Sequence, residues 1–215
     1  MAATKSPDIL SLYMDSVLEH EKYPLSVYKF CKTNEIEEQE FYKKYASLDT
    51  IKNHVWQVFF ENTMQVLHKN DGYAAMTRKD RLLTFYFTFF EVLLLNRSYV
   101  LFSLKGSESP MTAMGQLKHL RSSFKAFTTE LIEEGNDDKT LSLAKHPVGL
   151  FSEAAWSQLL FILKFWLDDT SPAFEKTDAA IEKSITVAFD VFDNTQLEAL
   201  VDLGKFLWKE KISKN

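Results

Sequence analysis

The chain has 215 residues, 46% apolar and 26% charged, which is ordinary for a soluble globular protein and long enough for one large domain, or for one large domain with a small appendage. Six Gly and five Pro are too few for a many-stranded β architecture, and a single cysteine excludes an internal disulfide framework and indicates a reducing cytoplasm. The net charge of −5 argues against a nucleic-acid partner without excluding one, because a local basic patch can coexist with an acidic whole.

The N-terminal third predicts one helix followed by a helix-turn-helix unit. The first helix starts after Ser6-Pro7-Asp8 and carries apolar residues at helical spacing. Two short helices, over residues 26–33 and 37–45, are separated by a tight turn, which is the arrangement of a helix-turn-helix. A new N-cap at Ser47 begins a long helix, which the turn Asn70-Asp71-Gly72 ends.

The rest of the chain also predicts helices. Residues 77–105 are expected to form one helix that is apolar on every side, as is typical of a central, buried helix. The later predicted helices span residues 111–134, 148–167, 173–192 and 195–211, with one or two helical turns over 139–145. No strand is convincing, so we predict an all-α fold. The nearly apolar stretch over 85–95 is too short for a bilayer, so we expect no transmembrane segment and a cytoplasmic protein.

The stretch from Ser26 to Ile51 resembles the start of the TetR family of regulators. The family pattern, near T-x-x-x-I-A-x-x-A-G-V-S-x-x-T-L-Y-x-H-F-x-S-K-x-x-L, falls on this stretch without a gap. Phe41-Tyr42 take the Leu-Tyr pair, Tyr45 the Phe and Ser47 the Ser. The resemblance implies a TetR-like fold, with a three-helix helix-turn-helix domain over residues 1–50 and a helical ligand-binding and dimerisation domain over 51–215.

Acidic residues replace the residues that would approach DNA in this pattern. The turn and the start of the recognition helix hold four carboxylates and no base, at Glu35, Glu37, Glu38 and Glu40. The family's basic residue at the start of the next helix is Leu48, and the first 50 residues carry six lysines against nine acids. DNA affinity depends on neutralised phosphates, and each uncompensated like-charge contact costs on the order of 1 kcal/mol. Acids at a helix N-terminus also complement its dipole, which explains their tolerance but does not restore DNA binding.

Two functions follow from these observations. We expect a non-enzymatic TetR-like protein that binds an apolar small molecule or lipid, with conventional operator binding disfavoured. The alternative is a ligand-controlled TetR-family transcriptional regulator that binds DNA as a dimer, through Lys29, Lys32, Tyr42, Lys43, Lys44 and Tyr45. No P-loop, G-x-G-x-x-G or G-x-S-x-G pattern and no His or Cys pair at metal spacing is present, so no catalytic residue, cofactor or metal is predicted.

The resemblance also implies a ligand cavity and a dimer face in the helical body. By helix position, the candidate pocket residues are Phe59, Met64, Phe85, Tyr86, Phe89, Phe124 and Phe161. The alternative is that these side chains simply fill a core. The candidate interface of a homodimer consists of two apolar stripes, namely Trp156, Leu160, Leu163, Trp166, Leu167, Ile181, Ile185 and Phe189. The alternative is that these stripes face the body's own core.

Overall fold

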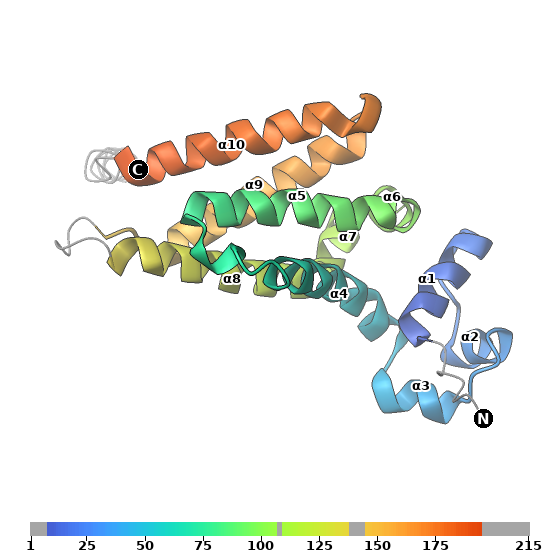
Figure 1. Ribbon diagram of the computed structural model, residues 1–215. Coiled ribbons are helices and arrows are strands. Elements are labelled where there is room, and N and C mark those ends of the chain that lie inside the picture. Colours follow the sequence, from blue (N-terminus) through green and yellow to red (C-terminus); the bar gives the residue numbers. More distant parts are fainter. Residues whose placement is uncertain (1–7, 107–108, 138–144, 195–215) are drawn as a thin grey trace, which may run out of the picture. The chain divides into compact units, whose positions relative to one another are not determined.

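Helices make up all regular structure in the part of the chain that the structure describes, which confirms the all-α prediction (Figure 1). The computed structural model describes residues 8–106, 109–137 and 145–194. The predicted helix over 195–211 and residues 139–144 of the predicted helical turns lie outside the described residues. In chain order the elements are α1 (Ile9–His20), α2 (Val27–Thr33), α3 (Glu38–Lys44), α4 (Leu48–His68), the 3₁₀ helix η1 (Tyr73–Ala75), α5 (Arg78–Leu95), α6 (Arg97–Lys105), α7 (Pro110–Gln116), α8 (Lys118–Asp137), α9 (Val148–Asp168), η3 (Pro172–Phe174) and α10 (Glu175–Asn194).

Side-chain caps set where the N-terminal helices begin. The Ser26 hydroxyl accepts a hydrogen bond from the backbone N–H of Lys29, and the Ser47 hydroxyl accepts one from that of Thr50, both at 3.2 Å. Asp8 caps α1 in the same way. Such a cap stabilises a helix start by about 1 kcal/mol. Because caps depend on local sequence, the predicted starts of α2 and α4 agree with the structure.

The prediction of a single helix over residues 77–105 is wrong. The chain breaks between α5 and α6 at Asn96, and the two helices are bent by 89°. The Asn96 side-chain amide donates to the Val92 carbonyl at 2.9 Å, while its backbone N–H donates to Leu93, three residues back. An asparagine side chain that takes the carbonyl of residue i−4 competes with the helix for that acceptor. One polar side chain thus ends a helix that hydrophobicity alone would continue.

The prediction of one helix over residues 111–134 is also wrong in two respects. The helix is interrupted at Leu117, which is buried and whose N–H bonds to Met114, three residues back. At the other end α8 continues past Gly135 to Asp137. There the Asn136 side chain donates to the His146 carbonyl at 3.0 Å and accepts from the His146 N–H at 2.7 Å. These contacts tie the end of α8 to the segment before α9.

The chain packs into two compact units. Unit 1 consists of Met1–Asp71 and Phe85–Phe124, and unit 2 of Gly72–Thr84 and Lys125–Asn215. The interior of unit 1 is aromatic, with Trp56, Phe85 and Phe89 fully buried. Unit 2 contains the antiparallel pair α9 and α10, which buries Trp156, Trp166, Ile181 and Ile185 (Figure 1).

By length and composition, one described helix, α9, could cross a membrane, and α5 with α6 could do so only as a bent pair. Buried core helices of soluble proteins meet the same criteria. α9 places Trp156, Ile162 and Trp166 inside unit 2. The absence of a transmembrane segment therefore stays a prediction.

One carboxylate, that of Asp169, organises the turn between α9 and α10. Its Oδ1 accepts from the Ser171 hydroxyl at 2.6 Å and from the Ser171 N–H at 2.8 Å. Its Oδ2 accepts from the Thr177 hydroxyl at 2.7 Å and from the Thr177 N–H at 3.0 Å. These hydrogen bonds, led by that of the Ser171 hydroxyl, hold the pKa of the Asp169 carboxyl well below its usual range.

The substitution Asp169→Asn is expected to lower the Tm at neutral pH, because an amide replaces a charged acceptor of four hydrogen bonds. A carboxyl with a lowered folded-state pKa stabilises the fold above its unfolded pKa of about 4, and that contribution is lost as the pH falls through the folded pKa. The Tm difference between wild type and variant should therefore be constant from about pH 7 to 5 and shrink only below about pH 4. A difference that shrinks between about pH 7 and 5 would contradict this role.

Candidate ligand pocket and helix-turn-helix

The helix-turn-helix unit is intact and has an aromatic core. The Phe30 ring on α2 lies 5.9 Å from the Phe41 ring on α3 and 6.0 Å from the Tyr13 ring on α1, measured between centroids. All three side chains are buried. The framework predicted from the apolar spacing of this stretch is therefore present in the structure.

The turn between α2 and α3 has the geometry that normally favours glycine. Glu35 has a φ of 54°, in the left-handed region, and the Ile36 N–H closes the turn onto the Cys31 carbonyl at 2.9 Å. A side chain in this conformation costs about 1–2 kcal/mol relative to glycine. The sequence pattern placed the family's turn glycine at this residue, so the chain keeps the turn and presents a carboxylate on it.

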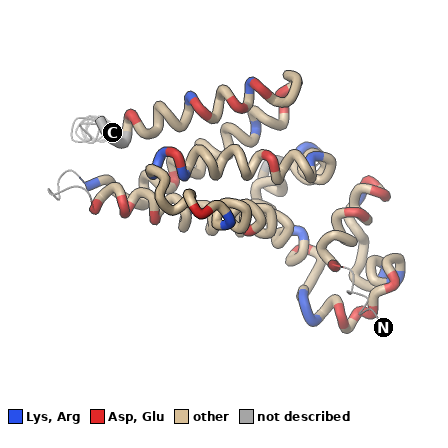
Figure 2. The backbone as a smooth tube through the Cα atoms, in the orientation of Figure 1, with Lys and Arg blue, Asp and Glu red and all other residues tan. Residues whose placement is uncertain are grey.

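The acids at the start of α3 lie mainly on the surface. Glu35, Glu37 and Glu40 are exposed and Glu38 is half-buried. Glu37 is the N-cap residue of α3 but its side chain makes no capping hydrogen bond. Glu40 forms an ion pair with Lys43, so the charge of this lysine is partly neutralised within α3. Figure 2 shows this order along α3, with acidic residues first and basic residues at the end.

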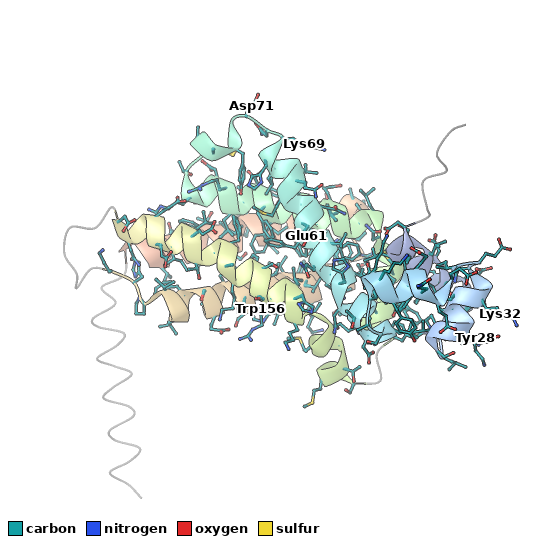
Figure 3. All side chains as sticks on the ribbon, turned by 90° about the horizontal axis from the view of Figure 1, so that it is seen from below. Tyr28, Lys32, Glu61, Lys69, Asp71 and Trp156 are labelled. Carbon is teal, nitrogen blue, oxygen red and sulfur yellow. The ribbon has the colours of Figure 1, made fainter. Side chains whose placement is uncertain are left out.

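Five of the six side chains predicted to contact DNA are exposed. Those are Lys29 and Lys32 on α2 and Tyr42, Lys43 and Lys44 on α3. The sixth, Tyr45, is buried, with its hydroxyl 3.0 Å from Nδ1 of His54. The Lys32 ammonium lies 5.7 Å from the ring centroid of Tyr28, and both side chains project from α2 (Figure 3). The two exposed bases of α3, Lys43 and Lys44, lie in its last turn.

The side chains predicted to line a ligand cavity are divided between the two units. In unit 1, Phe85, Tyr86, Phe89 and Phe124 are fully buried and pack against one another, with the Phe85 ring 5.6 Å from that of Phe89. Phe59 is also buried in unit 1 and Met64 is half-buried. Only Phe161 belongs to unit 2, where it is 60% exposed and lines a pocket.

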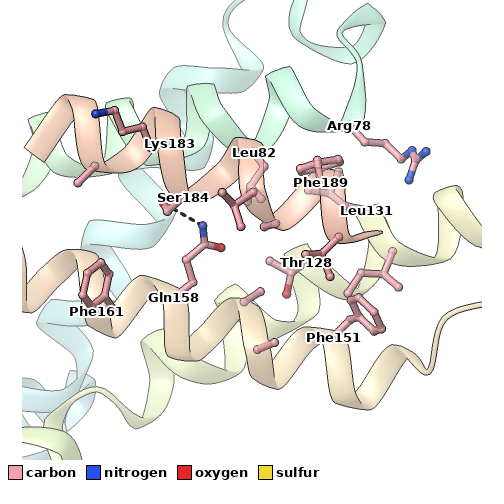
Figure 4. A pocket seen from close by; sticks show the side chains of 17 residues that line it. Arg78, Leu82, Thr128, Leu131, Phe151, Gln158, Phe161, Lys183, Ser184 and Phe189 are labelled. Atoms are coloured by element: carbon pink, nitrogen blue, oxygen red, sulfur yellow. Dashed lines mark hydrogen bonds between the residues drawn. The ribbon is translucent and has the colours of Figure 1, made fainter. Parts of the chain in front are cut away.

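That pocket has a volume of about 600 Å³ and lies entirely within unit 2. It is formed by the start of α5, α8, α9 and α10 (Figure 4). Its large apolar lining residues include Leu82, Leu131, Phe151, Phe161, Val187 and Phe189, and two cationic residues, Arg78 and Lys183, also line it. A mainly apolar concavity of this size suits a small apolar molecule.

The space exists because small side chains face each other across α9 and α10. Ala180, Ser184 and Ala188 recur every four residues and so share one face of α10. Ala154 and Ala155 of α9 line the same pocket. The predicted pocket residues were chosen by helix position, and the sequence feature that accompanies this pocket is the four-residue spacing of small side chains on α10.

The predicted dimer-interface residues are mostly inside unit 2. The buried ones are Trp156, Leu163, Trp166, Ile181 and Ile185, and the half-buried ones are Leu160, Leu167 and Phe189. Other apolar side chains of α9 and α10 are more exposed, notably Leu150, Phe161, Val187 and Val191. Dimerisation, and the face of α9 and α10 that would carry it, stay predictions.

Among residues 8–106, 109–137 and 145–194, no three His, Cys, Asp or Glu side chains are grouped so that they could hold a metal ion. The one cysteine, Cys31, is buried beside Phe30, and burial raises the pKa of its thiol, which disfavours the reactive thiolate.

The chain thus has a helix-turn-helix unit followed by an all-helical body with an apolar pocket, which is the architecture of a class of all-helical regulatory proteins. Residues 81–207, more than half of the chain, match the family model described as the tetracyclin repressor-like C-terminal domain. The chain belongs to the TetR family.

Solved structures show the same fold. A protein from Syntrophomonas wolfei, assigned to the TetR family of transcriptional regulators, is 17% identical with a TM-score of 0.64, and the match covers 86% of this chain and 92% of that one. The fatty acid degradation regulator FadR from Bacillus halodurans is 14% identical with a TM-score of 0.57, covering 86% and 96%. No curated protein matches the sequence.

Proposed function

We propose that this TetR-family protein is a non-enzymatic, cytoplasmic homodimer that binds an apolar small molecule or lipid in the pocket of unit 2. In this proposal residues 1–50 form a helix-turn-helix domain that is retained for packing or for a protein partner, and residues 51–215 form the ligand-binding and dimerisation domain. The observation that carries the proposal is the mainly apolar pocket of about 600 Å³ between α8, α9 and α10.

The electrostatics of α3 argue against conventional operator binding. A recognition helix presents its N-terminal residues to base edges, and here those positions carry exposed Glu37 and Glu40 after exposed Glu35. The alternative function is a ligand-controlled transcriptional regulator. The exposed Lys29, Lys32, Lys43 and Lys44 favour this alternative.

Mass spectrometry of the denatured protein tests the proposal. The full chain should be purified without detergent, and its organic extract should contain an apolar molecule in near-stoichiometric amount. An extract with no enriched compound, together with no uptake of added apolar molecules, would contradict ligand binding.

Filling the pocket is expected to weaken this binding. Ala188 lines the pocket from α10, so the substitution Ala188→Phe should lower the affinity for a fluorescent naphthalene probe at least about tenfold, because the new ring occupies ligand volume. Ala179 is exposed on the same helix and is not among the residues that line the pocket, so Ala179→Phe is the matched control and should bind as wild type does. Equal loss in both variants would place the binding elsewhere.

A further inference from the structure

We propose that the pocket of unit 2 selects apolar molecules that carry a neutral hydrogen-bond donor, such as a hydroxyl group, and that Oε1 of Gln158 is the acceptor. This inference rests on the proposed function and specifies the chemical class of its ligand. It depends on the direction in which one side-chain amide faces.

The hydrogen bonds of Ser184 determine the orientation of the Gln158 amide. The Ser184 hydroxyl donates its one hydrogen to the Ile181 carbonyl at 3.1 Å. Its oxygen can therefore only accept from Gln158, whose Nε2 lies 3.0 Å away across the gap between α9 and α10. The NH₂ group of the amide must face Ser184, and its oxygen must face the other way.

That oxygen is directed into the pocket. Figure 4 shows Gln158 reaching from α9 toward Ser184, with Oε1 turned to the side on which Leu82 and Thr128 lie. Within the described part of the chain, no donor forms a hydrogen bond with this oxygen. The pocket thus offers a fixed acceptor on a mainly apolar wall.

A fixed acceptor discriminates between ligands. A hydroxyl that reaches it forms a hydrogen bond, whereas an ether or ester at the same place leaves the carbonyl oxygen desolvated and without a donor. A carboxylate would meet both the carbonyl oxygen, which repels it, and the Arg78 and Lys183 side chains that also line the pocket, which attract it, so only the comparison of a hydroxyl with its ether isolates Gln158. The larger apolar part of the lining, including Leu131, Phe151 and Phe189, lies to one side of Gln158 in Figure 4. The donor should therefore lie near one end of an apolar chain.

Two matched probes test this inference on the full chain. Decanol and its methyl ether should be compared by displacement of a fluorescent naphthalene probe. Decanol is expected to bind about tenfold or more tighter than the ether, which corresponds to one satisfied hydrogen bond. In the Gln158→Met variant, which keeps the length without the acceptor, decanol and the ether should bind equally.

A second variant separates positioning from packing. In Ser184→Ala the amide is free to turn its NH₂ group into the pocket, so the preference for decanol over the ether should fall, and Ser184→Thr should restore it. A circular dichroism spectrum and a Tm like those of wild type show that each variant remains folded.

The outcomes distinguish the two proposals. If wild type binds decanol and its ether equally, the role of Gln158 is overturned while ligand binding stands. If wild type binds no probe, the proposed function and this inference fall together. A preference that survives in Gln158→Met also overturns the inference, because another group must then accept the hydrogen bond.

Discussion

Replacing Phe85 by alanine is expected to lower the free energy of unfolding by about 4 kcal/mol. The side chain is fully buried in unit 1, and its ring centroid lies 5.4 to 5.6 Å from those of Phe60, Phe89 and Phe124. Removing the ring deletes apolar burial and leaves a cavity that rigid neighbours fill poorly.

Urea unfolding followed by circular dichroism measures this effect. Phe161→Ala is the matched control, because Phe161 is 60% exposed and its loss should cost less than about 1 kcal/mol. The comparison also decides between the two interpretations of the aromatic helices. A cost below about 1 kcal/mol for Phe85→Ala would indicate that this ring lines an open cavity rather than a packed core.

Reversing the charges at the start of α3 is expected to raise affinity for duplex DNA about a hundredfold at low salt. The triple substitution Glu37→Lys, Glu38→Lys and Glu40→Lys removes three like-charge contacts, each worth on the order of 1 kcal/mol, and about 3 kcal/mol is roughly two decades in Kd. New phosphate contacts should also make the binding salt-dependent.

Fluorescence anisotropy of a labelled duplex, at about 50 and 200 mM salt, measures this gain. The matched control reverses Glu130, Glu133 and Asp137, which are exposed on α8 in unit 2 and change the net charge by the same amount. If the control gains as much affinity as the α3 variant, net charge rather than the helix-turn-helix accounts for the effect.

The helix-turn-helix could be predicted from the sequence because its determinants are local. The caps Ser26 and Ser47 act within three residues of themselves. The buried Phe30 and Phe41 follow from apolar spacing on two short helices. The left-handed turn at Glu35 was located by the family pattern, although glutamate is an unusual residue for that conformation.

The rest of the fold depends on features that periodicity does not contain. The bend at Asn96 comes from one side chain that competes for a backbone carbonyl within a hydrophobic run. The extended end of α8 depends on the contact of Asn136 with His146, ten residues further on.

Of the residues predicted to line a cavity, only Phe161 lines the pocket of unit 2, because large aromatic side chains can also fill a packed core. Phe85, Phe89 and Phe124 pack against each other, whereas room for a ligand remains where Ala180 and Ala188 face α9. Only the packing of α10 on α9 shows that these small residues face a shared space.

The proposal that acids at the start of α3 keep this protein off DNA is tested most directly by titrating the wild-type protein into duplex DNA from the region of its own gene. At about 50 mM salt we expect no saturable binding. Saturable binding that weakens with salt, and that is lost in the double variant Lys43→Glu and Lys44→Glu, would contradict the proposal. It would instead favour a ligand-controlled repressor or activator.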